Sequence, residues 1–315
     1  MRIVFQGGVN TVTGSRHMLE ANGRRVLRDC GLYQGRRKDA DAINRAFDFD
    51  PQQLHAVLLS HAHIDHCGNL PSLTRAGYRG PIYATTATVA LCDIMLRDAA
   101  RIQEQDAAYL NQKTNRQGLP AIEPLYSTAD AERAISLFLG SRYHEPIELT
   151  PGISAEAVDA GHILGAALHT VTLTEKGRSA RVGFAIDLGR HDLPLIRDPE
   201  FLPEPDVLVI ESTYGARLHT DATQAETQLG DAVRRALDRG GKILIPSFAL
   251  ERAQEVLFHL AHLMHDGRLP RIPIYVDSPM ATAVTKVFER NSVYLDDEFR
   301  QAREAMGLVL MADNV

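Results

Sequence analysis

Three histidines and one aspartate follow a short apolar run, and this segment limits most strongly what the chain can fold into. After the run 56–59, which is typical of a buried strand, the chain places His61, His63, Asp65 and His66 within six positions. Side chains two residues apart on an extended segment point the same way, so His61 and His63 are expected to face one point. Asp65 and His66 come where a helix is expected to begin, and they can face a second point nearby. Imidazole and carboxylate groups at this density suit a divalent metal such as zinc, although the segment alone also fits histidines on a solvated loop.

Length and composition describe a chain that is large enough for two domains. Its 315 residues are 44% hydrophobic, which is enough to bury a sizeable core. The formal net charge of −6 excludes a protein that coats nucleic acid through a general positive charge, but it does not exclude a local basic groove. The three cysteines are an odd number without a metal or disulfide spacing, so we expect a reducing compartment and no disulfide framework.

The sequence has no pattern of a signal peptide or a membrane span. Its first strand pattern turns at Gly7-Gly8, before an apolar core of signal length is reached. No stretch approaches the roughly 18 apolar residues that a membrane span requires. We therefore expect a cytoplasmic protein that does not enter a membrane.

The first 205 residues combine strand patterns with two helical patterns. Helices are expected at 85–111, where apolar residues recur at helical spacing, and at 127–139, where Ser127 and Asp130 can cap the first turn. Alternating or short apolar runs predict strands at 3–5, 17–20, 25–27, 56–59, 81–84, 153–160, 167–174 and 180–186.

Three further polar residues stand where these strands are expected to end. Asp29 and Asp187 each follow a strand, and His162 lies between two glycines that let the backbone approach another group closely. A single residue of this kind is more often structural, as a turn-capping aspartate or a buried histidine. If the strand ends meet at one rim of a sandwich, however, all three side chains can converge with His61 and His63.

The pattern changes near residue 206, after a proline-rich stretch. A strand is expected at 207–210 and ends in Glu211. Strands and helices then alternate, which predicts a parallel sheet. We therefore divide the chain into domains 1–205 and 206–315. The expected elements of the second domain are helices at 223–239, 250–265 and 280–289 and strands at 242–245 and 274–276.

These motifs, in this order, resemble the metallo-β-lactamase fold and, within it, the β-CASP branch of RNA-processing nucleases. The resemblance implies an α/β protein in which an αββα sandwich is followed by a partial α/β β-CASP domain. The matching motifs extend over essentially the whole chain: 11–15, 29–35, 61–66, 160–165, 187–190, 211–215 and 246–249 with Arg252 and Gln254-Glu255.

The resemblance also implies a site for two zinc ions. Asp65 would accept or relay a proton, Glu211 would orient a metal-bound histidine, and Asp29 would support such a histidine from behind. The implied ligands are His61, His63 and His162 for one ion, Asp65 and His66 for the other, and Asp187 for both.

The activity implied by the resemblance is that of a zinc-dependent phosphodiesterase acting on single-stranded RNA. Two zinc ions about 3.5–4 Å apart would lower the pKa of a bridging water, which would attack the phosphate as hydroxide. Two alternatives are a metallohydrolase of small esters or thioesters and a non-catalytic RNA-binding subunit or inactive fragment. A homodimer is one possible assembly.

The sequence departs from the family pattern in three respects. The family continues with two more histidines, the last in a His-Gly-Glu context, and both are missing, so we expect a fragment or a shortened member whose second zinc site is incomplete. Ile186 stands where the family usually has glycine and is large enough to crowd the site. Arg28 stands where an apolar residue usually precedes Asp29.

Overall fold

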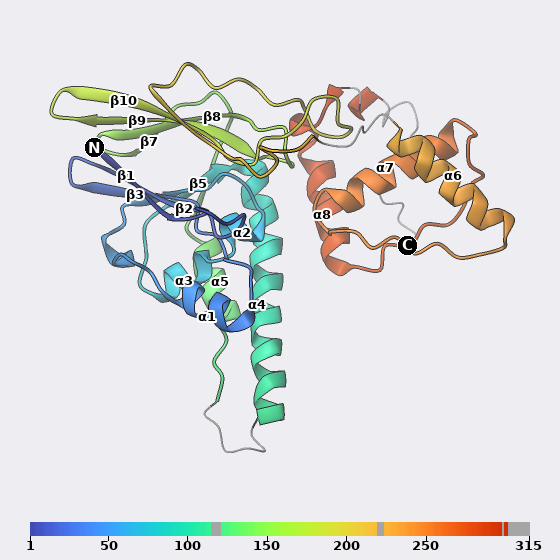
Figure 1. The fold of residues 1–315 in the computed structure, drawn as a ribbon, viewed down its shortest axis with the longest axis horizontal. Helices are drawn as coiled ribbons and strands as arrows, with labels where there is room; N and C mark the ends of the chain where they lie inside the picture. The colour runs from blue at the N-terminus through green and yellow to red at the C-terminus, as the bar shows by residue number, and fades with distance from the viewer. Residues whose placement is uncertain (115–120, 219–223, 298, 302–315) are drawn as a thin grey trace. The chain divides into compact units, whose positions relative to one another are not determined.

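The computed structural model describes residues 1–114, 121–218, 224–297 and 299–301 (Figure 1). Contacts within the chain divide it into two compact units, which we call the first and the second unit. The first consists of Met1–Ala160, Gly165–Leu188 and Glu200–Glu211, and the second of Gly161–Leu164, Gly189–Pro199 and Ser212–Val315.

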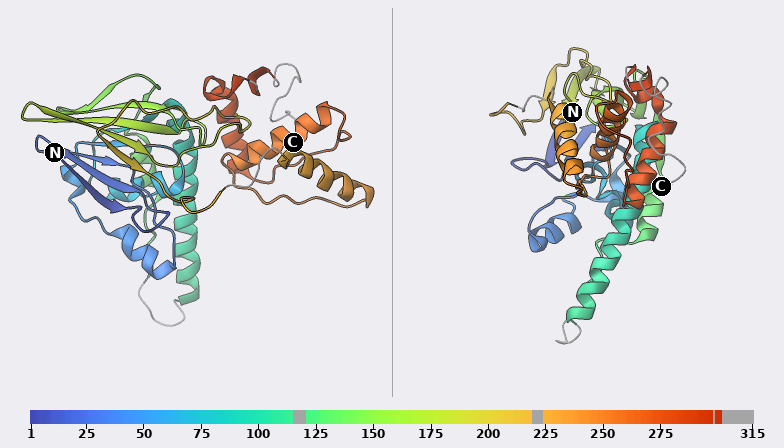
Figure 2. Two further views of the ribbon diagram at one scale, coloured as in Figure 1. Left: turned by 45° about the horizontal axis from the view of Figure 1, so that its top comes forward. Right: turned by 90° about the vertical axis from the view of Figure 1, so that its right-hand side faces the viewer.

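The first unit contains two β-sheets (Figures 1 and 2). Strands β1 to β3 of the first sheet are antiparallel, whereas β3 to β6 are parallel. The β2–β3 hairpin turns at Asn22-Gly23, and both residues have a positive φ, as a tight hairpin turn requires. The six strands lie in chain order: β1 Arg2–Gly7, β2 Arg16–Ala21, β3 Arg24–Arg28, β4 Ala56–Leu58, β5 Ile82–Thr85 and β6 Phe138–Ser141.

The second sheet has five strands in the order β11-β10-β9-β8-β7. All neighbours are antiparallel except β10 and β11, which are parallel. The predicted domain boundary at residue 205 falls just before β11, which joins this sheet. The strands are β7 Ile147–Thr150, β8 Ile153–Asp159, β9 Ala167–Glu175, β10 Arg178–Ala185 and β11 Val207–Ile210.

The inner faces of the two sheets form the core of the first unit. Leu19 and Val26 from the first sheet pack in one buried cluster with Val171 and Phe184 from the second. Side chains alternate between the two faces of a strand, so every second apolar residue reaches this layer. Ile186, which was expected to crowd the site, packs against this core cluster.

The helices of the first unit lie on the side of the first sheet that faces away from the second sheet (Figure 1). A capping box of Ser127 and Asp130 begins α5, as the sequence predicts. The prediction that this helix continues to Leu139 is wrong, because residues 138–141 pair with β5 as strand β6. The helices are α1 Arg37–Arg45, α2 Ile64–Cys67, α3 Leu70–Arg75, α4 Thr86–Thr114 and α5 Thr128–Ile135, and Pro51–Gln53 forms a 3-10 turn, η1.

The second unit is built mainly from helices in its described residues. A small core of Val233, Leu260, Leu263 and Leu269 joins α6 and α7. Thr223, the expected start of α6, lies outside the described residues. Among those residues, no helix combines the length and the apolar character that crossing a lipid bilayer would require. The elements are α6 Ala225–Asp238, α7 Arg252–His265, α8 Pro279–Arg290 and the 3-10 turn η3 Ser292–Tyr294.

The strands expected at 242–245 and 274–276 are not formed. Both segments are described, and neither has a hydrogen-bonded strand neighbour within the described chain. Leu244 and Tyr275 are 90% and 78% exposed. An apolar run becomes a strand only where another strand satisfies its backbone, and periodicity alone cannot reveal that partner. The parallel sheet predicted for residues 206–315 is therefore wrong for the described residues.

Candidate metal centre

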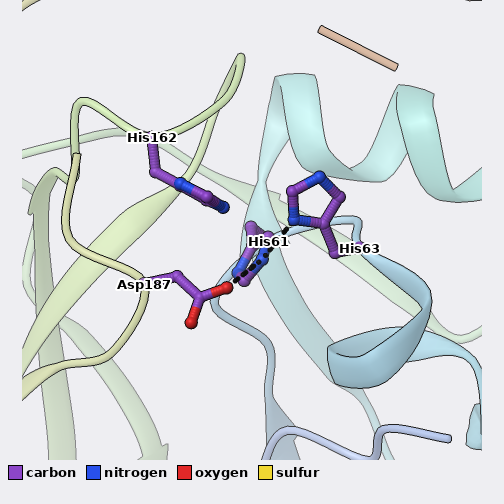
Figure 3. Close-up of side chains that lie close together, drawn as sticks. All are labelled: His61, His63, His162 and Asp187. Atoms are coloured by element: carbon purple, nitrogen blue, oxygen red, sulfur yellow. Dashed lines mark hydrogen bonds and ion pairs between the residues drawn. The ribbon is translucent and has the colours of Figure 1, made fainter. Parts of the chain in front are cut away.

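Four side chains from three separate segments of the chain gather at the ends of three strands (Figure 3). His61, His63, His162 and Asp187 each offer one ligand atom, and these atoms all lie within 4.8 Å of one another. His61 and His63 follow β4, His162 lies in the loop between β8 and β9, and Asp187 follows β10. Within the described part of the chain, no other group of three or more His, Cys, Asp or Glu side chains could hold a metal ion in this way.

The segment that leaves β4 is fixed by backbone hydrogen bonds from distant parts of the chain. A single helical turn, α2, begins after His63. The backbone N–H groups of Ser15, Cys30 and Leu32 donate to the carbonyl oxygens of residues 64–66 over 2.8–3.0 Å. Because these carbonyls are bound from outside the helix, the turn has little freedom to move.

One carboxylate oxygen lies between two imidazole rings. Oδ2 of Asp187 is 3.2 Å from Nε2 of His61 and 3.3 Å from Nε2 of His66. Nε2 of His61 is also 3.1 Å from Nδ1 of His63, and Nε2 of His66 is 3.7 Å from Oδ2 of Asp65. His66 and Asp65 are therefore not members of the four-residue group, but they lie directly beside it and share Asp187 with it.

Burial and the close approach of acids and imidazoles shift the pKa values of these groups. Burial alone would raise the pKa of Asp187, but hydrogen bonds from His61 and His66 hold it well below its usual range. Burial would lower the pKa of His66, but Asp29 and Asp187 raise it to about 10. Burial lowers the pKa of His61. Without a metal the chain therefore holds a proton on His66, and the carboxylates that hold it carry the negative charge that attracts a divalent cation.

Asp29 lies behind His66 and accepts several hydrogen bonds. Its Oδ2 accepts from Nδ1 of His66 at 2.8 Å, from Nη1 of Arg28 at 2.7 Å and from the hydroxyl of Ser15 at 3.2 Å. Its Oδ1 accepts from the backbone N–H of Ser60 at 2.8 Å. Burial would raise the pKa of Asp29, but Arg28 and His66 hold it far below the usual range. A carboxylate in this position fixes the tautomer and the orientation of the imidazole.

Arg28 places a permanent cation beneath the site. Its side chain is fully buried, its Cζ lies 5.0 Å from the ring centre of Phe184, and it pairs with Asp29. Burial and the charge of Arg28 together lower the pKa of His17 to about 4 and that of His169 to about 3. Both histidines are therefore neutral at pH 7.

Asp29 and Asp187 share an unusual backbone conformation. Their φ angles are 56° and 55°, in the left-handed region that favours glycine. Each aspartate is followed two residues later by a glycine. A Cβ atom at Gly31 would lie 1.5 Å from a carbonyl oxygen of α2, and one at Gly189 would lie 1.6 Å from a carbonyl oxygen of the His162 loop. These two Asp-x-Gly turns therefore bring the backbone directly against the loops that carry the histidines.

Glu211 contacts the chain next to Asp187. Its Oε1 accepts a hydrogen bond from the backbone N–H of Leu188 at 2.8 Å, and its own N–H donates to Ala185. Glu211 directly follows β11, whose pairing with β10 brings these residues together. In this structure, the side chain therefore supports the turn after β10, and the role of orienting a metal-bound histidine stays a prediction.

Sequence reasoning did not identify Ser15 and Ser60 as part of the site. The hydroxyl of Ser60 lies 2.9 Å from both oxygens of Asp29 and 3.0 Å from Nδ1 of His61. Its position directly before His61 was the one available signal. Ser15 ends the family motif 11–15, but its contact with Asp29 depends on how two strands pair and could not be read from that motif. The three cysteines are free and buried.

Comparisons with known proteins agree with this geometry. A family model described as the metallo-beta-lactamase superfamily domain matches residues 18–182. The chain belongs to the metallo-beta-lactamase superfamily. A model of the Beta-Casp domain matches residues 253–314. The resemblance to the metallo-β-lactamase fold with a β-CASP domain, and the α/β fold class that it implies, are therefore confirmed.

The relatives of this superfamily member include proteins named as ribonucleases and as transcription termination factors. They include a ribonuclease of Thermus thermophilus, 40% identical over 299 residues, and the transcription termination factor FttA of Methanocaldococcus jannaschii, 30% identical over 305 residues. A third is an endoribonuclease of Saccharomyces cerevisiae, 30% identical over 304 residues. The matches cover 95%, 96% and 94% of this chain, but only 63%, 45% and 37% of the relatives. The chain thus spans less than two thirds of each of these three proteins.

Proposed function

We propose that the protein is a metal-dependent phosphodiesterase that cleaves RNA. The observation that carries the proposal is the group of three imidazoles and one carboxylate within 4.8 Å, in a chain whose relatives include ribonucleases. Single-stranded RNA is the proposed substrate. His61 is buried and Asp187 is half-buried, and an unstacked strand can bend to reach a recessed group more easily than a stiff duplex can.

Zinc is the proposed metal, because it takes nitrogen and oxygen ligands and the donor set fits it. When bound, such ions lower the pKa of a water and stabilise charge on phosphate oxygens. The approach of one Asp187 oxygen to two imidazoles supports a carboxylate that serves two ions. The proposed ligands are His61, His63 and His162 for the first ion, Asp65 and His66 for the second, and Asp187 for both.

Three acidic residues have proposed roles beside the ligands. Asp65 would accept or relay the proton that hydrolysis releases, and burial raises the pKa of its carboxyl. Asp29 would keep His66 in the orientation that binds metal. Glu211 would keep the turn after β10 in place through Leu188. We also propose that the first domain extends through Glu211, and that the protein acts in the cytoplasm, where its cysteines stay reduced.

The full-length protein should be assayed side by side on labelled single-stranded RNA, duplex RNA and a thioester, with parallel elemental analysis. We expect zinc in the purified protein, cleavage of the single strand, and loss of that activity after chelation or in His63→Ala. His191→Ala is the matched control, because this histidine is exposed and pairs with Asp198. If the protein hydrolyses the thioester and does not cleave RNA, it is a small-molecule hydrolase and this proposal is wrong. If the folded protein contains no zinc and binds RNA without cleaving it, the protein is a non-catalytic RNA-binding subunit.

A further inference from the structure

A buried acidic residue stands on strained backbone directly before α7. Glu251 has φ 70° and ψ −63°, and the N–H of Arg252 donates across it to the carbonyl oxygen of Leu250 at 3.0 Å. This is a γ-turn with a positive φ, a conformation that is rare and strained. Such strain persists where the surrounding structure demands it, often at functional sites.

The Glu251 side chain does not cap the helix that follows it. Its Oε2 instead accepts a hydrogen bond from the backbone N–H of Leu164 at 3.3 Å, and both residues are buried. Burial and the neighbouring Glu255 raise the pKa of Glu251 to about 8, so the carboxyl is mostly uncharged at pH 7. An uncharged acid can be buried here without a cationic partner and can still accept this hydrogen bond.

Leu164 lies two residues after His162, in the short loop between β8 and β9. Ala160 donates to Ala166 at 3.0 Å and closes the base of this loop. The carbonyl oxygen of Gly165 accepts hydrogen bonds from two threonine hydroxyls at 2.6 and 2.9 Å. If the Glu251 carboxyl were removed, the N–H of Leu164 would be buried without this acceptor, which is unfavourable. The loop would then rearrange to satisfy it and would move His162.

We propose that Glu251 is a positioning residue for His162. The γ-turn aims its carboxyl at the backbone of the loop, and this contact sets where the imidazole meets the other members of the metal group. The inference rests on the proposed function, because it takes His162 as a metal ligand. Glu255 is a suitable comparison: it pairs with Arg252 at 2.7 Å and is one helical turn away.

Four variants of the full-length protein separate this role from a general effect on folding. Glu251→Ala removes the carboxyl, Glu251→Gly removes it and also relieves the strain at positive φ, Glu251→Gln keeps an acceptor, and Glu255→Gln is the matched control. Zinc affinity is measured by competition with a chelator, and amide hydrogen exchange of residues 160–166 is measured in the metal-free protein. Thermal midpoints are recorded for each variant.

We expect zinc affinity to fall about 10–100-fold in both Glu251→Ala and Glu251→Gly, as is typical when an outer contact of a metal ligand is lost. Exchange at Leu164 should accelerate in both, although the glycine variant should melt higher than the alanine variant. Glu251→Gln should stay within about threefold of the wild-type affinity, a difference below 1 kcal/mol, and Glu255→Gln should match the wild type.

Three results would overturn the inference. The first is that Glu251→Ala and Glu251→Gly keep the zinc affinity and the amide exchange of the wild type. The others are that Glu251→Gln binds zinc as weakly as Glu251→Ala, or that zinc affinity across the variants simply follows their thermal midpoints. A wild-type protein that binds no zinc would overturn the proposed function and this inference with it. Wild-type-like variants of a protein that does bind zinc would overturn this inference alone.

Discussion

The two segments that bring histidines to the metal group are held in different ways. Residues 61–66 leave a buried strand, three backbone N–H groups bind their carbonyls, and Asp29 fixes His66 from behind. The loop that carries His162 is closed at its base by backbone and threonine contacts, and near its tip one carboxyl oxygen binds Leu164. The first segment is therefore supported along its backbone and behind one imidazole ring, whereas the second is supported at its base and beside its tip.

Asp187 contacts two of the three imidazoles of the first segment, those of His61 and His66, and also belongs to the group that contains His162, so its loss should have the largest effect. Asp187→Asn keeps the size of the side chain and tolerates the left-handed backbone, but it removes the anionic oxygen between His61 and His66. Zinc content and RNA cleavage should fall more than about 100-fold, beyond the 10–100-fold range of outer contacts. Asp192→Asn is the control, because Asp192 also has a positive φ, 59°, and is exposed. Retention of zinc by Asp187→Asn would contradict a shared carboxylate.

Loss of Asp29 should disturb the first segment despite its many other contacts. Asp29→Asn leaves the buried cation of Arg28 without its counter-charge, which should lower the free energy of unfolding by about 3–5 kcal/mol. Zinc affinity should fall about 10–100-fold, because His66 loses its carboxylate partner. Combining the change with Arg28→Met should restore much of the stability, measured by urea unfolding, but not the zinc affinity.

Asp130→Asn provides the control for Asp29, because Asp130 is also buried but lies in the capping box of α5. This variant should lose some stability and keep its zinc affinity. Equal zinc loss in both variants would show that general destabilisation, and not the Asp29–His66 contact, weakens the site.

The metal-free first segment should lose stability as the pH rises. The pKa of His66 is about 10 in the fold, above the value near 6.5 of an unfolded chain. Its stabilising contribution is therefore complete below about pH 6.5 and is lost as the pH rises toward 10. The pKa values of Asp29 and Asp187 are lowered, so their contributions are lost only in acid. From pH 7 to pH 10 the free energy of unfolding should fall by on the order of 2–4 kcal/mol. If the free energy of unfolding of a His66→Gln variant, measured in urea titrations, falls as steeply from pH 7 to pH 10, groups other than His66 cause the pH dependence.

Replacing Glu211 should have the smallest effect, and it distinguishes support of the turn after β10 from proton transfer in the reaction. Glu211→Gln keeps an oxygen that can accept from the N–H of Leu188, so RNA cleavage should fall less than about tenfold. A residue that transferred protons in the reaction would lose about 10²–10⁴-fold. Glu204→Gln, at an exposed position of the preceding loop, should leave the rate unchanged.

The histidine cluster could be predicted because the information is local. An apolar strand followed by His-x-His-x-Asp-His specifies the chemistry and its place at a strand end within residues 56–66. Except for β6 and β7, at 138–141 and 147–150, the strands of the first unit were predictable for the same reason. The strand at 138–141 was not, because the pattern continued the helix after Ile135 and pairing with β5 decided the outcome. The runs at 242–245 and 274–276 looked like strands, and only the absence of a described neighbour shows otherwise.

The supporting contacts of the site could not be predicted in the same way. Ser15 reaches Asp29 because two strands pair, and Glu251 reaches Leu164 across 87 residues of sequence. Such contacts follow from the fold and leave no period or spacing in the sequence. Gly31 did carry a signal, because a glycine after a strand-end aspartate predicts an unusual turn, but its close contact with α2 was visible only in the structure.

The two Asp-x-Gly turns also affect how inherited changes in this protein should be interpreted. At Gly31 and at Gly189 the place of a side-chain methyl group is already taken by a carbonyl oxygen of a histidine-bearing loop. An allele that encodes alanine at either position would displace that loop while every histidine and aspartate of the site stayed unchanged. A survey that scores alleles by their metal ligands alone would therefore count such a null allele as functional.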